Sequence, residues 1–179
     1  MHYLSIHPSP VGNLTLASDG EALTGLWIEG QKYFCSTIPD EEKKFVELPI
    51  FCAAKNWLNR YFAGEKPALS ELPLRPAGGA FRQEVWALLR EIPYGELTTY
   101  GALARQTAKQ LGRAHMSAQA IGSAVGHNPI SIIIPCHRVV GTNGSLTGYA
   151  GGIDLKVKLL QHEGADLSHL FVPKTGTAL

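Results

Sequence analysis

A segment rich in proline and glycine divides this chain into two parts with different secondary-structure patterns. Three prolines and two glycines fall within residues 67–79, and such a cluster is typical of a linker. Short alternating apolar patterns come before it, whereas amphipathic helical patterns come after it. The chain has 179 residues, which is enough for two small domains. The sequence therefore predicts an α+β protein with domains at residues 1–76 and 77–179.

The first part predicts an antiparallel sheet followed by one helix. Three short alternating patterns are typical of strands, and they occupy residues 3–6, 13–17 and 22–28. Apolar residues then recur at helical spacing from Ile50 to Phe62, and Gly64 ends that pattern. We expect this sheet-plus-helix unit to form the N-terminal domain.

The second part predicts a helical domain. Four segments have helical patterns, at residues 81–90, 100–106, 117–126 and 153–162. Thr98 and Thr99 can cap the second of these helices. The second and third helices, joined by a loop, have the outline of a helix-turn-helix. We also expect a short buried strand at Ser131–Ile134, directly before Pro135.

The third helical segment is almost bare of large side chains. Gly122 and Gly126 lie within it beside alanine and serine, although glycine destabilises a helix interior by roughly 1 kcal/mol relative to alanine. One interpretation is that this helix packs tightly against a neighbour. The other is that a thin helix enters a narrow groove, such as the minor groove of B-DNA, which is about 6 Å wide.

Cys136 is the candidate nucleophile. It follows Pro135 and precedes His137 and Arg138, and nearby positive charge favours a reactive thiolate of low pKa. The alternative is that Cys136 is a small buried apolar residue. The chain has three cysteines, without a Cys-x-x-Cys pair. This pattern argues against a disulfide framework and shows no closed zinc site.

Two later features could complete a site around this cysteine. The glycine-rich segment 141–152 carries Tyr149 but lacks the Lys-Ser/Thr ending of a phosphate-binding loop. We expect it to form a mobile lid or a pocket wall. Glu163 follows the last helical segment, where it is either a solvated surface residue or a buried group that orients a histidine.

Charge and hydropathy restrict the partners only weakly. Residues 80–179 carry nine Lys and Arg against six Asp and Glu, which is compatible with a polyanion partner. No apolar run approaches the roughly 18 residues of a membrane span. The first residues also lack the pattern of a signal peptide. We therefore expect a cytoplasmic protein without a membrane partner.

Several motifs in register resemble the O6-alkylguanine-DNA alkyltransferases, also called methylated-DNA–protein-cysteine methyltransferases. The motifs are Asn128-Pro129, the run from Ile134 through Cys136 to Val140, Gly148-Tyr149, Gly151-Gly152, Lys156, Leu159-Leu160 and His162-Glu163-Gly164. Pro93-Tyr94-Gly95-Glu96 and Thr99-Tyr100 are similar to the start of the family's helix-turn-helix. The resemblance extends from about Phe81 to Gly164, and the Pro-Cys-His-Arg run is its most specific part.

The resemblance implies a role for each residue of the site. Cys136 would accept the alkyl group, His137 would deprotonate it through a water, and Glu163 would hold the histidine tautomer. Asn128 would brace the active-site turn. Tyr100 would assist rotation of the nucleotide or donate a hydrogen bond to the leaving guanine.

The resemblance also implies a pocket for a base that has been flipped out of the duplex. Tyr149 would form its wall, and backbone groups at Cys136 and Val139 would read the edge of guanine. Ala150 stands where some members have a serine that bonds the guanine oxygen. The backbone at Tyr149 and Ala150, together with Tyr100, would then make that bond.

The helix at 117–126 would enter the minor groove with Ala118 and Gly122 on its bare face. Gln119 stands where many members have an arginine that fills the gap left by the flipped base. Glutamine can bond the orphaned cytosine but lacks the charge and stacking of arginine. We therefore expect flipping to occur with weaker DNA affinity than an arginine version would have.

The resemblance implies a monomer that binds alkylated double-stranded DNA and is consumed after one repair, because a thioether is not hydrolysed under mild conditions. The transfer needs no metal or organic cofactor. Cys35 and Cys52 have no obvious partners for the zinc site of some members. The sequence leaves open the range of alkyl groups and any activity on alkylated thymine.

Three other functions compete with this interpretation. A lesion sensor that binds alkylated DNA would lack Cys136. An unrelated cysteine hydrolase or redox protein would leave the bare helix unexplained. A transcriptional regulator would need an effector domain or a second DNA-binding element, and neither is visible in the sequence.

Overall fold

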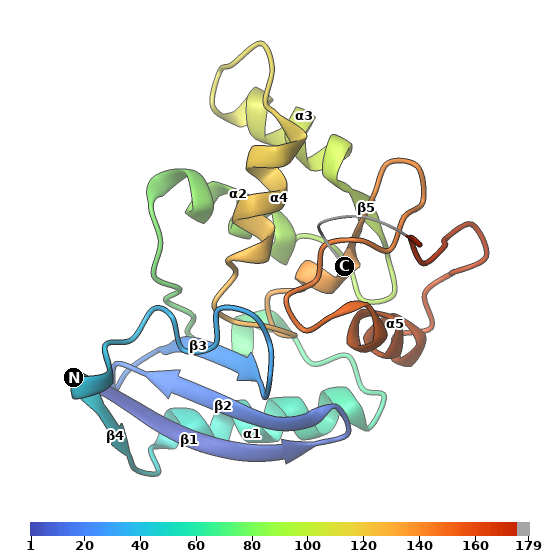
Figure 1. The fold of residues 1–179 in the computed structure, drawn as a ribbon. Coiled ribbons are helices and arrows are strands. Elements are labelled where there is room, and N and C mark those ends of the chain that lie inside the picture. The colour runs from blue at the N-terminus through green and yellow to red at the C-terminus, as the bar shows by residue number, and fades with distance from the viewer. Residues whose placement is uncertain (175–179) are drawn as a thin grey trace. The chain divides into compact units, whose positions relative to one another are not determined.

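A computed structural model of the chain describes residues 1–174. Within them lie a four-stranded sheet, a two-stranded sheet and five α-helices (Figure 1). The predicted α+β class is therefore confirmed. The final five residues of the predicted second domain lie outside the described residues.

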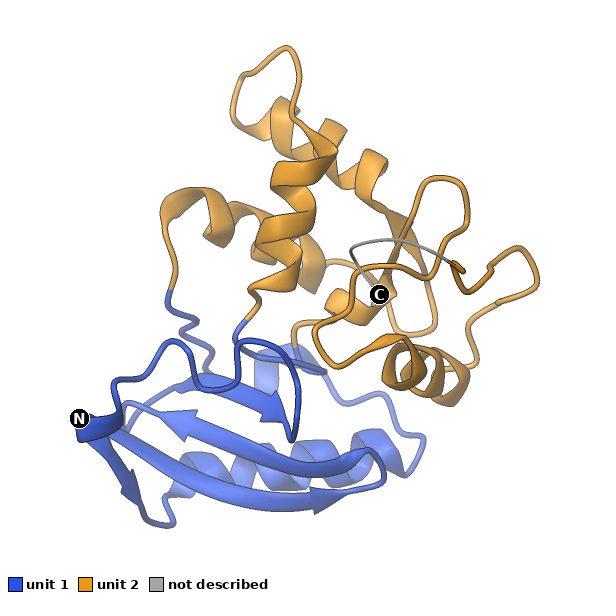
Figure 2. Cartoon of the chain, in the orientation of Figure 1, with its two compact units in different colours: residues 1–77, 129–133 blue, residues 78–128, 134–179 orange. Residues whose placement is uncertain are grey.

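The chain forms two compact units (Figure 2). The first unit holds Met1–Ala77 together with Pro129–Ile133, and the second holds Gly78–Asn128 and the chain from Ile134 onward. The segment Pro129–Ile133 therefore belongs to the first unit, although it lies far along the sequence. Cys136 and Glu163 both belong to the second unit.

The sheet of the first unit has the order β3-β2-β1-β4. Its strands are β1 (His2–Ser9), β2 (Gly12–Ser18), β3 (Leu23–Ile28) and β4 (Lys43–Phe45). Strands β1 to β3 pair antiparallel, as the alternating patterns predicted, whereas β4 pairs parallel with β1. The sequence did not predict β4, because a three-residue strand is too short to show alternation.

Helix α1 (Pro49–Phe62) covers the sheet with its apolar side. Phe51, Ala54 and Leu58 are fully buried, and they recur at the three- and four-residue spacing of one helix face. Gly64 has a φ of +87°, a left-handed conformation that glycine adopts without strain and that ends many helices. The predicted helix and its glycine stop are confirmed.

The strand predicted at Ser131–Ile134 is wrong. Ile130 forms one isolated parallel bridge to Leu26 of β3, and the chain then turns. Ile132 has a φ of +69°, and the backbone N–H of Ile133 donates to the Ser131 carbonyl at 2.8 Å. The apolar run correctly indicated burial, but burial alone does not determine whether the backbone is extended or turned.

The second unit consists mainly of helices. They are α2 (Ala80–Arg90), α3 (Tyr100–Gln110), α4 (Ala118–Gly126) and α5 (Ile153–His162). Strands β5 (Thr98–Thr99) and β6 (Val139–Val140) pair parallel. The first three of these helices pack on one another (Figure 1). The indole N–H of the fully buried Trp86 donates to the Ala124 carbonyl at 2.8 Å.

Helix α3 begins where predicted and ends four residues later than predicted. The Thr99 hydroxyl accepts from the Ala102 N–H at 3.1 Å and so caps the helix. Thr107 and Ala108 are buried, so the apolar side of α3 continues beyond Gln106. Gly112, with a φ of +62°, follows the extended helix.

Candidate active site

A short turn places Cys136 at the first residue of a 3-10 helix, Cys136–Arg138. The cysteine is 4% exposed. Its backbone N–H donates to the Ile134 carbonyl at 2.8 Å, and the Asn128 side-chain amide donates to the same carbonyl at 2.9 Å. Asn128 thus ties the end of α4 to the turn that carries the sulfur.

Burial raises the pKa of the Cys136 thiol, and a hydrogen bond from Asn128 and the charge of Lys156 only partly oppose this effect. The expected low-pKa thiolate is therefore wrong for the resting protein. Arg138 is paired with a carboxylate, and burial lowers the pKa of His137. The sequence neighbours of Cys136 therefore supply little net positive charge, and the thiol needs a base.

His137 can be that base. Its side chain and that of Glu163 are fully buried, and Nε2 lies 2.7 Å from Oε1 of Glu163. A carboxylate only accepts, so Nε2 carries the proton and Nδ1 is the unprotonated nitrogen. Nδ1 is buried and has no hydrogen-bond partner among the residues that the structure describes. It is therefore available to accept a proton.

Arg138 binds Glu163 from the other side. Its Nε donates to Oε2 at 2.8 Å and Nη2 donates to Oε1 at 2.9 Å, while Nη1 donates to the Ile92 carbonyl at 2.6 Å. Burial would raise the pKa of Glu163, but hydrogen bonds from His137 and Arg138 outweigh it and hold that pKa well below its usual range. Glu163 is buried and ionised, which excludes the solvated-surface interpretation.

The backbone before helix α3 also helps to hold this carboxylate. The Gly95 N–H donates to Oε2 of Glu163 at 3.2 Å. Gly95 has a φ of +79°, and a Cβ there would lie 2.9 Å from the Glu163 carbonyl oxygen. Only glycine fits this turn without strain.

Tyr100 and Lys156 support the glycine-rich segment 141–152. The Tyr100 hydroxyl donates to the carbonyls of Gly148 at 3.1 Å and Thr147 at 3.3 Å. The Lys156 ammonium donates to Thr147 at 2.9 Å and also to Val139, and it lies 6.0 Å from the centre of the Tyr100 ring. Burial lowers the pKa of Lys156 to about 8.

Sequence reasoning assigned no role to Lys156. Its position on α5 carried a signal, because it lies three and four residues before the buried Leu159 and Leu160 and so shares their face. A lysine on an apolar helix face is seldom buried without a specific partner. Its partners here are two backbone carbonyls, one of them from β6, directly after the cysteine turn.

Tyr149 lies close to His137, with the ring centres 6.4 Å apart and the ring planes at 77°. It is 7% exposed, and its hydroxyl is buried without a hydrogen-bond partner among the described residues. Gly148 before it has a φ of +85°, and a Cβ there would lie 2.4 Å from the Tyr100 hydroxyl. Val139 is buried and Ala150 is half-buried.

Helix α4 presents a bare face. Ala118 and Gln119 are exposed, whereas Ile121 and Val125 are buried on the opposite side. A Cβ added at Gly122 would meet nothing within 4 Å, and the same holds for Gly126. Close packing against a neighbour therefore does not explain these glycines.

The structure thus separates the predicted residues into two groups. The first group lies around the Cys136 sulfur, and its members are linked to their neighbours by hydrogen bonds and ring contacts. It consists of Cys136, His137, Glu163, Asn128, Tyr100 and Tyr149. The residues of α4 lie on a separate, exposed face. Among residues 1–174, no group of three or more His, Cys, Asp or Glu could hold a metal ion, and no helix there is long and apolar enough to cross a membrane.

Two family descriptions match the chain. Residues 1–76 match the ribonuclease-like domain of 6-O-methylguanine DNA methyltransferase. Residues 80–165 match its DNA binding domain.

Relatives of known name are similar over most of the chain. A methylated-DNA–protein-cysteine methyltransferase of Haemophilus influenzae is 46% identical over 161 residues, covering 90% of this chain and 86% of the relative. One from Methanosarcina acetivorans is 43% identical and covers 91% and 99% of the two chains. The crystal structure of Mycobacterium tuberculosis OGT in complex with DNA has a TM-score of 0.78 and 40% identity, covering 94% of each chain.

Proposed function

Because the chain belongs to the methylated-DNA–protein-cysteine methyltransferases, we propose that Cys136 is the cysteine that accepts the alkyl group. The chain is a transferase that repairs DNA by direct reversal, moving an alkyl group from O6 of guanine to its own cysteine. The observation that carries the assignment is the buried His137–Glu163 pair beside the Cys136 turn. Cys35 and Cys52 lie in the other unit.

The first step is removal of the thiol proton. His137 accepts it at Nδ1 through a water molecule, and the imidazolium is stabilised by the Glu163 carboxylate. The pKa directions support this order, because a buried thiol stays protonated until a base acts and a buried imidazole stays neutral. Arg138 holds the carboxylate and does not touch the reacting atoms.

The second step is a single displacement at the alkyl carbon. The Cys136 sulfur forms a bond to that carbon as the bond from carbon to O6 of guanine breaks, and the bonding electrons leave with guanine. The leaving base then needs a proton or a hydrogen bond. Burial raises the pKa of Tyr100, so its hydroxyl stays protonated, and it would donate to the leaving base by releasing the Thr147 and Gly148 carbonyls. The product is a thioether, and each protein molecule acts once.

We propose that α4 enters the minor groove of double-stranded DNA. Its bare exposed face suits a groove about 6 Å wide. The alkylated guanine would leave the stack, as bases do in enzymes that act on them, and Tyr149 would form a wall of its pocket. Gln119 would occupy the space that the base leaves. The protein would act as a monomer, and its cytoplasmic location stays a prediction.

The pH dependence of alkyl transfer tests the roles of His137 and Cys136. Because burial lowers the pKa of His137, we expect the rate to stay level as the pH falls through about 6.5, the usual histidine pKa, and to decline only below it. The measurement is single-turnover methyl transfer from a duplex containing O6-methylguanine, between about pH 5 and 9.

The matched variant is His137→Gln. Without the base, the Cys136 thiol must lose its proton to solvent. We therefore expect the rate to rise about tenfold per pH unit up to the pKa of the thiol. A decline in the wild-type rate centred at or above the usual histidine pKa would contradict the assignment. So would a His137→Gln profile with the wild-type shape.

Gln119→Arg tests the role of α4. The arginine adds a charge and a planar group that can stack in the duplex, so we expect tighter binding by about three- to tenfold, which is roughly 1 kcal/mol. Binding to an alkylated duplex is measured by fluorescence anisotropy in a Cys136→Ala background, which leaves the lesion intact. Gln161→Arg, at an exposed position on α5, adds the same charge away from α4. Equal or weaker binding by Gln119→Arg would contradict the proposal.

A further inference from the structure

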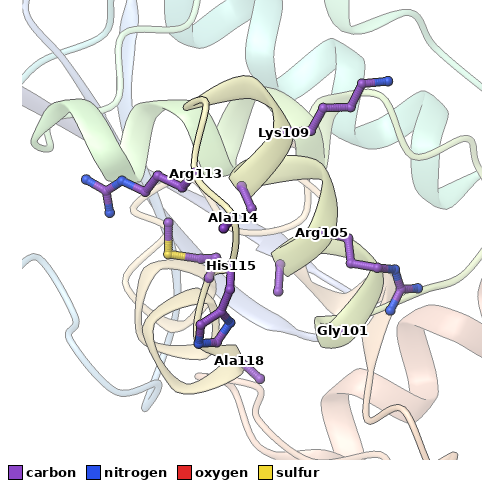
Figure 3. Close-up of a pocket in the computed structure, with 10 residues that line it drawn as sticks. Gly101, Arg105, Lys109, Arg113, Ala114, His115 and Ala118 are labelled. Carbon is purple, nitrogen blue, oxygen red and sulfur yellow. The ribbon is translucent and has the colours of Figure 1, made fainter.

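A hollow beside the first residue of α4 is rimmed by positive side chains. It has a volume of about 550 Å³. Its lining comes from α3, from the loop that follows α3 and from Ala118 at the start of α4 (Figure 3). Arg105 and Lys109 lie on α3, and Arg113 lies on the loop. We call these three residues the α3–loop cations. The chemistry described above uses none of them.

The α3–loop cations are free to bind an anion. All three are exposed, and none forms an ion pair with another residue in the described part of the chain. Several cations of the first unit differ in this respect. The exposed Arg75, for example, pairs with Glu21 at 3.4 Å.

The surrounding sequence leaves this charge unopposed. No aspartate or glutamate occurs from residue 97 to residue 153, a stretch that contains α3, the loop, α4 and the cysteine turn. The same stretch contains four Lys and Arg residues, and the one outside the cluster is Arg138. Arg138 is neutralised by Glu163. The α3–loop cations therefore dominate the formal charge of this helix-turn-helix region.

The cations lie on both sides of the start of α4. In Figure 3, Arg113 extends to one side, Arg105 and Lys109 extend to the other, and His115 lies with Ala118 between them. A helix inserted in the minor groove has a sugar-phosphate strand on either side of it. Cations that flank such a helix can thus reach phosphates on both strands.

We propose that Arg105, Lys109 and Arg113 bind backbone phosphates on the two strands beside the lesion. This inference rests on the proposed function, because it requires α4 to lie in the minor groove. Phosphate contacts carry no sequence information but supply much of the affinity and fix the register of the protein on DNA. They compensate for Gln119, which brings no charge to the groove. Lys109 belongs to the part of α3 that extends beyond its predicted end.

The test is the salt dependence of binding to an unmodified duplex, which gives no reaction. Each phosphate contact contributes about 0.9 to the slope of log affinity against log salt concentration. For the triple variant Arg105→Gln/Lys109→Gln/Arg113→Gln we expect the slope to fall by about 2 to 3 and the affinity at about 0.1 M salt to fall at least tenfold. All three positions are exposed, so the variant should fold.

The matched control is Lys32→Gln/Lys44→Gln/Lys158→Gln, which removes the same formal charge from other exposed positions. It should keep the wild-type slope within about one contact. Methyl transfer from the free base O6-methylguanine should be equal in all three proteins, since it needs no phosphate contact.

The outcomes separate the two proposals. An unchanged slope in the α3–loop variant, or an equal loss in the control, overturns the phosphate contacts and leaves the chemistry of Cys136 intact. If the α3–loop variant shows the reduced slope but the wild-type protein transfers no methyl group, the phosphate contacts are supported and the proposed function is overturned.

Discussion

Replacing Cys136 with alanine is expected to abolish alkyl transfer completely and to leave the binding of alkylated DNA intact. The sulfur is the atom that forms the new bond, and no other side chain at the turn can replace it, since His137 and Arg138 are committed to Glu163. The loss should therefore exceed that for any residue that only assists. Methyl transfer from a labelled duplex measures the reaction, and anisotropy measures binding.

Cys35→Ala and Cys52→Ala are the matched controls for this variant. Each removes one thiol from the other unit and should leave the transfer rate within about twofold of wild type, as for changes away from a reacting centre. Residual single-turnover transfer by Cys136→Ala, or loss of transfer in either control, would overturn the assignment of the acceptor.

Glu163→Gln is expected to slow alkyl transfer by about 10²- to 10⁴-fold, the range typical of losing general-base catalysis, because His137 can no longer act as the base. An amide can donate to His137, which favours the tautomer with its proton on Nδ1, and it no longer stabilises the imidazolium. The variant also leaves Arg138 facing a neutral partner. Breaking a buried ion pair costs about 3–5 kcal/mol of stability, so the midpoint of thermal unfolding should fall as well.

A loss of folded protein must be distinguished from a loss of catalysis in this variant. The rate should stay low at temperatures well below the unfolding midpoint, and it should increase with pH as in His137→Gln. Glu96→Gln, an exposed position near the same turn, should change neither stability nor rate. Recovery of the wild-type rate on cooling would show that Glu163 has only a structural role.

The ionisation of Glu163 also sets the acid limit of stability. Its folded pKa lies below its unfolded pKa because His137 and Arg138 bind the charged form. The pair therefore stabilises the fold at neutral pH, and this contribution is lost as the pH falls toward the lowered pKa. The contribution of Glu163 should therefore begin to fall below about pH 4.3, the usual pKa of glutamate, and the lowered pKa of His137 already makes folding less favourable below about pH 6.5.

Local patterns predicted the secondary structure well wherever a segment was long and periodic. Helices α1, α2, α4 and α5 lie where apolar spacing placed them, because a single buried stripe is sufficient to specify a helix. Short or irregular segments were less predictable. Strand β4 is too short to alternate, and Ile132 adopts a left-handed φ of +69° that no local rule assigns to isoleucine.

The sequence predicted which residues lie near Cys136 but not their electrostatics. The sequence placed His137 and Glu163 beside Cys136 only through the family resemblance, because 26 residues separate the two partners of that buried pair. Burial could not be read from the neighbouring residues. The cysteine beside a histidine and an arginine suggested a thiolate, yet those two residues direct their charge and hydrogen bonds toward Glu163. Burial of the thiol, with little net charge from these neighbours to oppose it, therefore reversed the expected direction of the pKa shift.

The most direct test of the account is peptide mass mapping of the protein after incubation with a duplex containing O6-methylguanine. We expect the peptide containing Cys136 to gain the mass change of one methylation and the peptides containing Cys35 and Cys52 to stay unchanged. The modified fraction should reach at most one methyl group per protein molecule, even with the duplex in excess. Methylation at another residue, or an unchanged mass with the DNA bound, would contradict the account.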